Sequence, residues 1–503
     1  MLTADATLDT GQKWSGKLMQ TETFATVGQS IAWHAAHTPH QIAVVRQGGS
    51  VTYRRLARDL TRCVQALRER NVGPGTLVGL ALSRRYTHLV IVIASELLGA
   101  SVTSVLTRDD YIIPHCQIIF DDCARVAPSS AVVPLTPDWL AGLRPPAGDT
   151  PSLLERDLPG DQVVRIVRSS GTSGTPKAAV MSFATRQYRL RKTFERLADE
   201  IFPAPRMLCP YPLNIGLADV RVLGVLQNGG TVYLAAKEDI DGLIVSGAVN
   251  YAVFWVGDLN ALVERGVAAP AGGKVCIEVM GDTVAKPLRE RVRRIFNAPI
   301  WNKYATSETS VIAVIDDDHV GTIEHDMEVR LVDEHCNDVP PGEPGRIMVR
   351  GGSMVHSYFN DPELTRANFI DGWFRTSDLG TMIAPGKLTL LGRVDGVLNI
   401  AGLKFATAPI EERIRQIAGI SDAALLRIDD DGDVGTLLVA VETAIPDVAR
   451  VSELIRPALG RLPITDSIMT SRSFPRTRTG KVQRHAIEAE FNGHVAPQVA
   501  AAD

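Results

Sequence analysis

Cysteine is scarce in this chain, and its few copies are not paired in sequence. Among 503 residues there are six cysteines, and no two have the C-x-x-C spacing of a structural zinc site. His115, Cys116 and Cys123 lie close enough in sequence to suggest a metal site. Small buried or half-buried thiols in a reducing cytosol are the simpler interpretation. The six positions are Cys63, Cys116, Cys123, Cys209, Cys276 and Cys336.

Long apolar runs and a strong net charge are also missing. No stretch stays apolar for the roughly 18 to 20 residues that a membrane helix needs, so we expect no membrane span. The first 25 residues carry Asp5 and Asp9 and lack an apolar core, so we expect no signal peptide and a cytoplasmic protein. The formal net charge of −4 provides no basic field and argues against a nucleic-acid partner.

What is present is the composition of a globular protein, 45% hydrophobic and 22% charged. A chain of 503 residues is too long for one ordinary core, so two or more domains are expected. Leu56, Leu60, Val64 and Leu67 have helical spacing, and a strand is predicted at 77–80 after the Gly73–Gly75 break. Helices and strands alternate through the first 390 residues, which favours a layered α/β fold of mixed sheets.

A domain boundary is predicted near Gly392–Gly396, dividing the chain into residues 1–394 and 395–503. The second part is predicted to be a small α+β domain. Glycines on both sides of Asp395 suit a hinge, although a surface turn between two strands explains them equally well. The predicted strands are 397–400, 423–427 and 436–442, and the predicted helices are 409–418 and 448–459.

The sharpest local signal is the segment from Ser169 to Lys177, SSGTSGTPK. Its glycines leave backbone N–H groups bare, its hydroxyls add donors and Lys177 adds a charge, a combination that suits phosphate oxygens. The Walker A spacing fails, and strands at 163–167 and 178–181 predict a hairpin loop. A turn without function is the alternative. The candidate phosphate-binding residues are Ser170, Gly171, Thr172, Ser173, Gly174, Thr175 and Lys177.

Four further segments follow in order. YATSET at 304–309 offers an aromatic ring, hydroxyls and the carboxylate of Glu308, and DGWFRTSD at 371–378 ends in Asp378. GRVD at 392–395 adds Arg393, and PRTRTGK at 475–481 ends in Lys481. Alone, each has an ordinary explanation: a core tyrosine, an exposed glutamate or a solvated basic run.

Together the five segments resemble the adenylate-forming superfamily, which contains acyl-CoA synthetases, stand-alone adenylation enzymes and firefly-type luciferases. The resemblance runs from about Thr52 to Arg484. It implies a large N-terminal domain to about residue 394 and a mobile C-terminal domain after Asp395. It also implies two half-reactions, in which a carboxylate attacks the α-phosphate of ATP and a thiol then takes the acyl group. The thiol is usually that of CoA or of a carrier protein's phosphopantetheine.

The resemblance also assigns roles to residues. Thr172, Ser173, Thr175 and Lys177 match the loop that holds the β- and γ-phosphates, Glu308 matches the Mg²⁺ ligand, and Ser307 matches the hydroxyl beside the α-phosphate. Tyr304 matches the ring against adenine, with Gly281, Asp282 and Thr283 on its other side, and Asp378 and Arg393 match the ribose contacts. Lys481 matches the lysine of the first half-reaction, which rotation about Asp395 would later remove.

The substrates are less well determined. Asn399, Thr407 and Pro409 depart from the family pattern on the face expected to meet the thiol, and Ser377 replaces a glycine at what we expect to be an exposed turn. The acid pocket is expected to include Asn214, Ile215 and Gly216; Asn214 could bond a ring substituent or cap a turn.

Members that activate amino acids place an aspartate near Leu217, and Asp219 is out of register, so an aryl or acyl acid without an α-amino group is favoured. A separate carrier protein is a possible partner. Nitrite activation with an amine acceptor and a catalytically dead nucleotide binder remain alternatives, although Glu308 and Lys481 are both retained.

Overall fold

The computed structural model describes residues 26–144, 157–169, 176–195, 205–281, 284, 286–400, 403–428, 436–460, 462, 467–476 and 482–499. Several predicted site residues lie outside the described residues: the predicted phosphate-binding residues Ser170–Thr175, together with Asp282, Thr283 and Lys481. Asp395 is described for its backbone alone. The roles predicted for these residues therefore stay predictions.

The first sheet has six strands in the order β6-β5-β3-β4-β7-β8. The first five are parallel, and β8 turns back against β7, which confirms the predicted hairpin. The helical spacing of Leu56, Leu60, Val64 and Leu67 is confirmed, because all four are buried on α2 (Tyr53–Arg68). The strands are β3 (Leu77–Ala81), β4 (Ser101–Ser104), β5 (Ile118–Asp121), β6 (Val132–Pro134), β7 (Val163–Ser169) and β8 (Lys177–Ser182).

A second sheet of fourteen strands runs in the order β16-β17-β19-β20-β15-β14-β13-β12-β11-β9-β10-β1-β2, with β18 paired to β19. It is mixed: β13 to β1 along this order pair in parallel and the rest are antiparallel. Its strands are β1 (Ile42–Arg46), β2 (Gly49–Thr52), β9 (Arg206–Leu208), β10 (Thr231–Tyr233), β11 (Tyr251–Trp255), β12 (Cys276–Met280), β13 (Ile300–Thr306), β14 (Ser310–Ile315), β15 (Val320–Ile323), β16 (Met327–Val332), β17 (Pro344–Gly351), β18 (Phe369–Ile370), β19 (Trp373–Ala384) and β20 (Lys387–Arg393).

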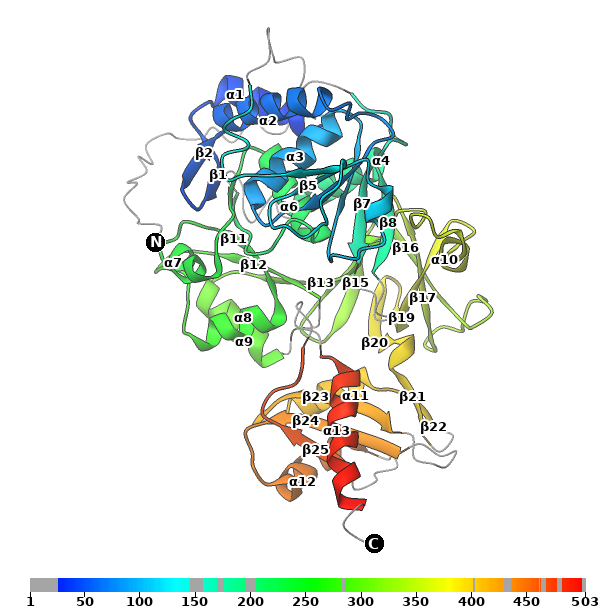
Figure 1. Ribbon diagram of the computed structural model, residues 1–503. Coiled ribbons are helices and arrows are strands. Elements are labelled where there is room, and N and C mark those ends of the chain that lie inside the picture. Colours follow the sequence, from blue (N-terminus) through cyan, green and yellow to red (C-terminus); the bar gives the residue numbers. More distant parts are fainter. Residues whose placement is uncertain are drawn as a thin grey trace.

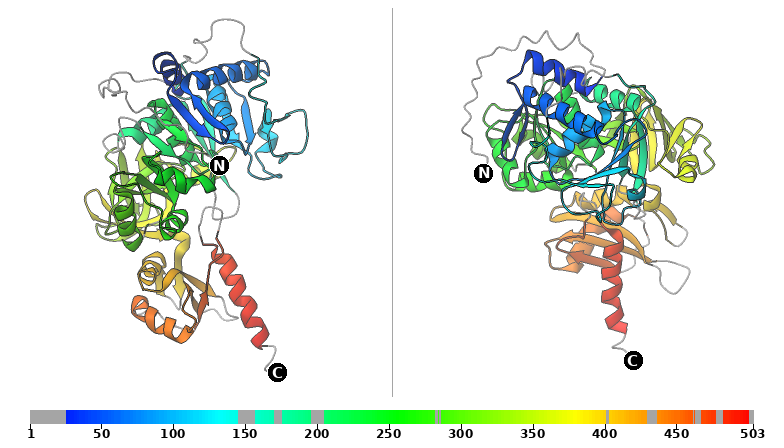
Figure 2. Two further views of the ribbon diagram at one scale, coloured as in Figure 1. Left: turned by 90° about the vertical axis from the view of Figure 1, so that its left-hand side faces the viewer. Right: turned by 45° about the horizontal axis from the view of Figure 1, so that its top comes forward.

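Helices cover these sheets, with α1 to α3 gathered at the end of the molecule farthest from the C-terminus (Figures 1 and 2). The predicted layered α/β architecture with mixed sheets is confirmed. The remaining helices up to β20 are α1 (Val27–His37), α3 (Arg85–Leu97), η1 (Ile113–His115), α4 (Phe183–Glu195), α6 (Gly216–Gln227), η3 (Lys237–Asp239), α7 (Ile240–Val245), α8 (Val256–Glu264), α9 (Lys286–Phe296) and α10 (Pro362–Asn368).

After β20 the chain forms a smaller α+β part at the opposite end (Figure 1). A 3₁₀ turn, η4 (Val394–Gly396), joins the two parts. The predicted elements are present, although α11 ends at Arg415, three residues before the predicted end. The elements here are β21 (Val397–Ile400), β22 (Leu403–Ala406), α11 (Ala408–Arg415), β23 (Ile420–Ile428), β24 (Thr436–Thr443), α12 (Val448–Leu459), β25 (Ile468–Ser471) and α13 (Arg484–Val499).

The hydrophobic clusters of the described residues do not cross this junction. Two clusters lie wholly after residue 397, and Ile414 and Val441 are fully buried in the larger one. The other four lie wholly before residue 391. Each part therefore buries its own apolar side chains.

Two expectations about the chain as a whole can be compared with the structure. No helix in the described ranges is long and apolar enough to cross a membrane. The described residues contain no metal-ligand group at His115, Cys116 and Cys123, so the metal interpretation is wrong there. The Cys116 thiol is buried and bonds the Ile112 carbonyl, whereas Cys123 is exposed, contrary to the expectation of a buried or half-buried thiol, and its thiol bonds the Ala81 carbonyl.

Candidate active site

The turn between β13 and β14 presents Ser307 and Glu308. Its geometry is fixed by Thr306, whose hydroxyl accepts a bond from the Thr309 backbone N–H at 3.1 Å and lies 2.9 Å from the Thr309 hydroxyl. Ser310 closes the turn at φ +64°, in the left-handed region that non-glycine residues seldom adopt. Short local bonds thus hold both candidate residues at the tip of a hairpin.

Glu308 is buried against Tyr358. The Tyr358 hydroxyl donates to Glu308 Oε1 at 2.8 Å, and both side chains are less than 10% exposed. Burial and the neighbouring carboxylate raise the pKa of the Tyr358 phenol. Lys177 Nζ lies 5.6 Å from the centre of the same ring, within the range of a cation–π contact. The structure thus brings Lys177 and Glu308, predicted from separate motifs, to one tyrosine.

Tyr304, Asp378 and Arg393 also meet. The Tyr304 hydroxyl donates to Asp378 Oδ2 at 2.7 Å across 74 positions of sequence. Asp378 and Arg393 are opposite each other in the β19–β20 ladder, with Oδ1 and Nη1 3.8 Å apart. Burial and the Asp378 carboxylate raise the pKa of Tyr304. Ser377, expected in an exposed turn, is instead half-buried within β19, beside an irregularity where the β17–β19 register shifts between Arg346 and Met348.

Arg189 is a functional candidate that the sequence did not reveal. From α4, its Nε donates to the Ser353 carbonyl at 2.8 Å and its Nη2 to the Glu308 carbonyl at 2.9 Å. Both terminal nitrogens lie 3.2 Å from the Ser307 carbonyl. Burial lowers the pKa of this guanidinium to about 10. The planar guanidinium of Arg189 therefore holds the backbone of the candidate catalytic turn at Ser307 and Glu308.

The predicted acid-pocket residues surround the start of α6. Ile215 is the N-cap residue, no side chain caps the helix, and Asn214 Oδ1 is buried without a partner among the described residues. The turn-capping alternative for Asn214 therefore finds no support at this helix. Asp219 is 2% exposed and lies 3.3 Å from Arg186, which also pairs with Glu96 at 2.8 Å. Asp219 is thus committed to a buried ion pair.

Gly281 directly follows β12 and requires glycine on two grounds. Its φ is +88°, and a Cβ there would lie 2.5 Å from the Trp255 ring. The Tyr211 hydroxyl in turn holds the Trp255 backbone N–H at 2.8 Å. In the predicted Gly281–Thr283 segment, the structure thus explains why the first residue is a glycine.

Comparison with known proteins gives a family match and relatives that differ in length, and this chain spans less than half of the first of them. The family model described as "AMP-binding enzyme" matches residues 31–359. Phenyloxazoline synthase MbtB from Mycobacterium sp. (strain MCS) is 26% identical over 98% of this chain, which spans 43% of that synthase. Indoleacetate–CoA ligase from Aromatoleum aromaticum is 26% identical over 90% of this chain and 95% of its own length. The ATP-bound crystal structure of MatB from Rhodopseudomonas palustris matches with a TM-score of 0.80 at 19% identity, covering 93% of this chain and 99% of that one.

Proposed function

The chain belongs to the AMP-binding enzyme family, and on that basis we propose that it uses ATP and Mg²⁺ to activate a carboxylic acid as an acyl-adenylate. A thiol of CoA or of a separate carrier protein then takes the acyl group. Similarity to a CoA ligase supports the first acceptor, and similarity to a synthase of which this chain spans 43% supports the second. The observation that carries the proposal is the meeting of Lys177 and Glu308 at Tyr358, because cation and carboxylate from separate motifs then face one site.

In this proposal the cationic residues bind phosphate oxygens and the carboxylate binds the metal ion. The attack joins two anions, so cations and donors must offset their repulsion as charge redistributes on phosphorus. Lys177, the Ser170–Thr175 loop and Lys481 hold phosphate oxygens, and the Ser307 hydroxyl donates beside the α-phosphate. Glu308 fits Mg²⁺, because a carboxylate is the hard oxygen ligand that this ion prefers. The ion supplies positive charge to the phosphates when bound.

The nucleoside is held on the other side of the turn. We propose that Tyr304 packs against adenine, with Gly281, Asp282 and Thr283 on its other side, and that Asp378 and Arg393 bind the ribose. The Tyr304–Asp378 hydrogen bond supports this assignment, because it fixes the carboxylate next to the ring. The domain boundary at 394/395 and the hinge at Asp395 belong to the same proposal. The separate hydrophobic clusters on the two sides support them.

The favoured acid lacks an α-amino group. A pocket that recognises an ammonium needs a carboxylate able to face it. Asp219 is nearest to the expected position, but its charge is already committed to Arg186 in the core. We therefore place aryl or acyl acids, bound near Asn214, Ile215 and Gly216, ahead of amino acids.

Acid-dependent release of pyrophosphate from ATP tests the proposal. The panel contains aryl, fatty, amino and hydroxy acids plus nitrite, and each active acid is then offered CoA or phosphopantetheine. We expect one class of carboxylic acid to raise the rate well above background and the Glu308→Gln variant to lose most of that gain. Release with nitrite alone would favour the oxyacid alternative. No release with any acid, while ATP still binds, would favour a nucleotide binder without activity.

A further inference from the structure

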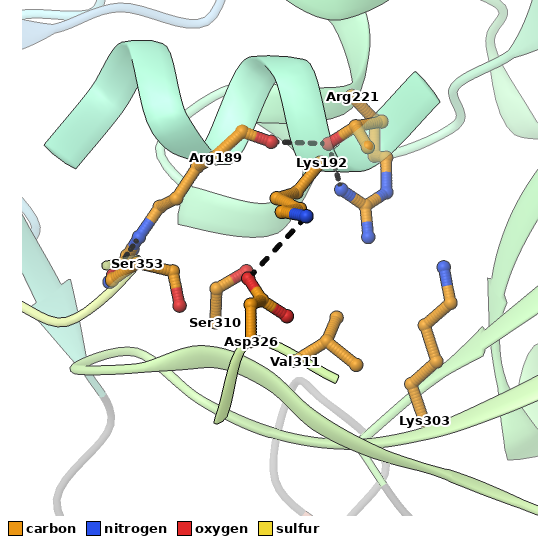
Figure 3. A pocket seen from close by; sticks show the side chains of 9 residues that line it. Arg189, Lys192, Arg221, Lys303, Ser310, Val311, Asp326 and Ser353 are labelled. Atoms are coloured by element: carbon orange, nitrogen blue, oxygen red, sulfur yellow. Dashed lines mark hydrogen bonds and ion pairs between the residues drawn. The ribbon is translucent and has the colours of Figure 1, made fainter. Parts of the chain in front are cut away.

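Side chains from outside the sequence motifs hold the backbone of the candidate site at two places. At the first, Figure 3 shows Arg189 of α4 reaching toward Ser353, whose carbonyl accepts a bond from its Nε. The cavity beside Arg189 measures about 20 Å³, room for a single water molecule, so we place no ligand in it. At the second place, Tyr111 bonds the chain just before β8.

Tyr111 bonds the residue that directly precedes Lys177. Its hydroxyl donates to the Pro176 carbonyl at 3.2 Å, across 65 positions of sequence. Lys177 begins β8 and pairs with Ser169 at the end of β7, so Pro176 lies where the chain enters the second strand of the hairpin. A hydrogen bond at this point restrains the backbone from which the Lys177 side chain leaves.

A buried ion pair fixes Tyr111 itself. Asp110 Oδ1 lies 2.9 Å from Arg168 Nη1, and both side chains are 2% exposed. The Asp110 carboxylate also accepts the Leu106 and Ile112 backbone N–H groups at 2.9 and 3.2 Å. The guanidinium carbon of Arg168 lies 4.6 Å from the centre of the Tyr111 ring, within the range of a cation–π contact. Since Arg168 lies on β7, this segment contacts the hairpin from both strands.

The ammonium of Lys177 is restrained separately. An antiparallel bridge joins Ala179 of β8 to Tyr358, and the Tyr358 ring lies 5.6 Å from Lys177 Nζ. Tyr111 thus acts on the backbone next to Lys177, whereas Tyr358 faces its charged end.

Exposure sets the Tyr111 bond apart from a bond that mainly stabilises the fold. Tyr111 is 41% exposed, so a hydroxyl released from Pro176 would bond water, and folding would lose little. The Pro176 carbonyl, in contrast, would lose its link to the segment that Asp110 fixes. The expected consequence of removing the hydroxyl is therefore a change in the position of Lys177 more than a change in stability.

We propose, resting on the function proposed above, that Tyr111 is a positioning residue, which holds the backbone at Pro176 so that the Lys177 ammonium meets the β- and γ-phosphates of ATP. Tyr111 itself contacts no phosphate and acts through Lys177. A charge-assisted hydrogen bond to phosphate needs a short distance and a correct direction, and a displacement of about 1 Å weakens it substantially.

The first test is Tyr111→Phe, which removes the hydroxyl and keeps the ring against Arg168. Calorimetry measures the affinity of the full chain for MgATP and for AMP, which lacks the β- and γ-phosphates. One neutral hydrogen bond corresponds to about 3- to 10-fold in affinity, so the Kd for MgATP should rise by that factor and the Kd for AMP should stay unchanged. An unchanged MgATP affinity, or an equal loss for both nucleotides, would overturn the positioning role.

A second test asks whether Tyr111 acts through Lys177. In a Lys177→Met background, Tyr111→Phe should change the Kd for MgATP by less than about twofold, because the ammonium that it positions is gone. A further loss as large as that in the wild-type background would show that the two residues act independently, and it would overturn the proposal.

Tyr53→Phe is the matched control. It removes the tyrosine hydroxyl that donates to the Leu226 and Gly230 carbonyls at 3.0 and 2.8 Å in the core, and it should leave both nucleotide affinities unchanged. A weaker affinity for MgATP alone in this control would show that loss of any tyrosine-to-carbonyl bond has the same effect, and it would count against Tyr111.

Pyrophosphate release separates this proposal from the proposed function. In Tyr111→Phe the KM for ATP should rise together with the Kd, while the KM for the acid is retained. Acid-dependent release with an unchanged KM for ATP would overturn the positioning role and leave adenylation standing. A selective loss of MgATP affinity in a chain that releases no pyrophosphate with any acid would retain the positioning role and overturn adenylation.

Discussion

Replacing Tyr358 with Phe removes one hydroxyl from the proposed magnesium site and nothing else. The lost bond is the one from Tyr358 Oη to Glu308 Oε1, 2.8 Å long. Phenylalanine keeps the ring that packs 5.4 Å from Phe369 and that faces Lys177 Nζ, so no cavity forms and the cation–π contact remains. The variant therefore isolates the orientation of the Glu308 carboxylate.

The expected effect follows from that single bond. A hydrogen bond to a buried charged group contributes about 1.5–3 kcal/mol. Groups that orient a metal ligand typically change metal affinity by about 10- to 100-fold when removed. We therefore expect the Mg²⁺ concentration for half-maximal pyrophosphate release to rise by about 10- to 100-fold, and the free energy of unfolding to fall by about 1.5–3 kcal/mol.

The assay is a Mg²⁺ titration of acid-dependent pyrophosphate release, together with urea unfolding. Tyr86→Phe is a matched control, because it removes a tyrosine-to-carboxylate bond of 2.9 Å to Asp59, in helices away from the site. The control should lose stability and keep the wild-type Mg²⁺ dependence. An unchanged Mg²⁺ dependence in Tyr358→Phe, or the same shift in both variants, would refute the orienting role of Tyr358.

Three further predictions concern the turn, the C-terminal lysine and pH. Arg189→Lys keeps the positive charge but loses the planar guanidinium that bonds several carbonyls at once, so kcat should fall by about 10-fold or more. Arg191→Lys, on the exposed side of α4, is the control. If the Arg189→Lys and Arg191→Lys variants have equal kcat, Arg189 has no positioning role. Lys481→Ala should slow adenylate formation by orders of magnitude but spare thioester formation from a supplied adenylate; equal loss in both steps would contradict the rotation about Asp395. Burial, with Arg165 nearby, lowers the pKa of His88 to about 3. Below pH 6.5, His88 therefore binds a proton in the unfolded chain but not in the folded chain. Because of His88 alone, the free energy of unfolding at pH 5 should be about 2 kcal/mol lower than at pH 7.5. Urea unfolding at both pH values checks this, and His88→Asn showing the wild-type pH dependence would exclude that source.

The sequence predicted those features that depend on local pattern. The spacing of Leu56, Leu60, Val64 and Leu67 defines α2, and the strands on both sides of the phosphate loop define the β7–β8 hairpin. The motif residues Tyr304 and Asp378 were also found, since each lies in a recognisable segment, although their contact across 74 positions required the fold.

The sequence did not reveal Arg189 and Tyr358, because nothing near them marks their role. Arg189 is one of several basic residues on α4, and only the folded chain brings it to the Ser307 and Glu308 carbonyls. Tyr358 reads as an ordinary core aromatic until its hydroxyl is seen on Glu308. For Cys116 and Cys123, the disfavoured metal alternative could be excluded only once the fold showed that the two thiols bond different carbonyls.

The separation of the hydrophobic clusters at residues 391–397 bears on how the molecule melts. Among the described residues the two parts have separate hydrophobic clusters, so we expect them to unfold as two cooperative units and a calorimetric scan of the free chain to contain two heat-absorption peaks. A variant in the smaller part would then shift one peak and leave the other in place. A ligand that contacts both parts stabilises them jointly, so merging of the two peaks would show that the ligand bridges the two parts, without any measurement of turnover.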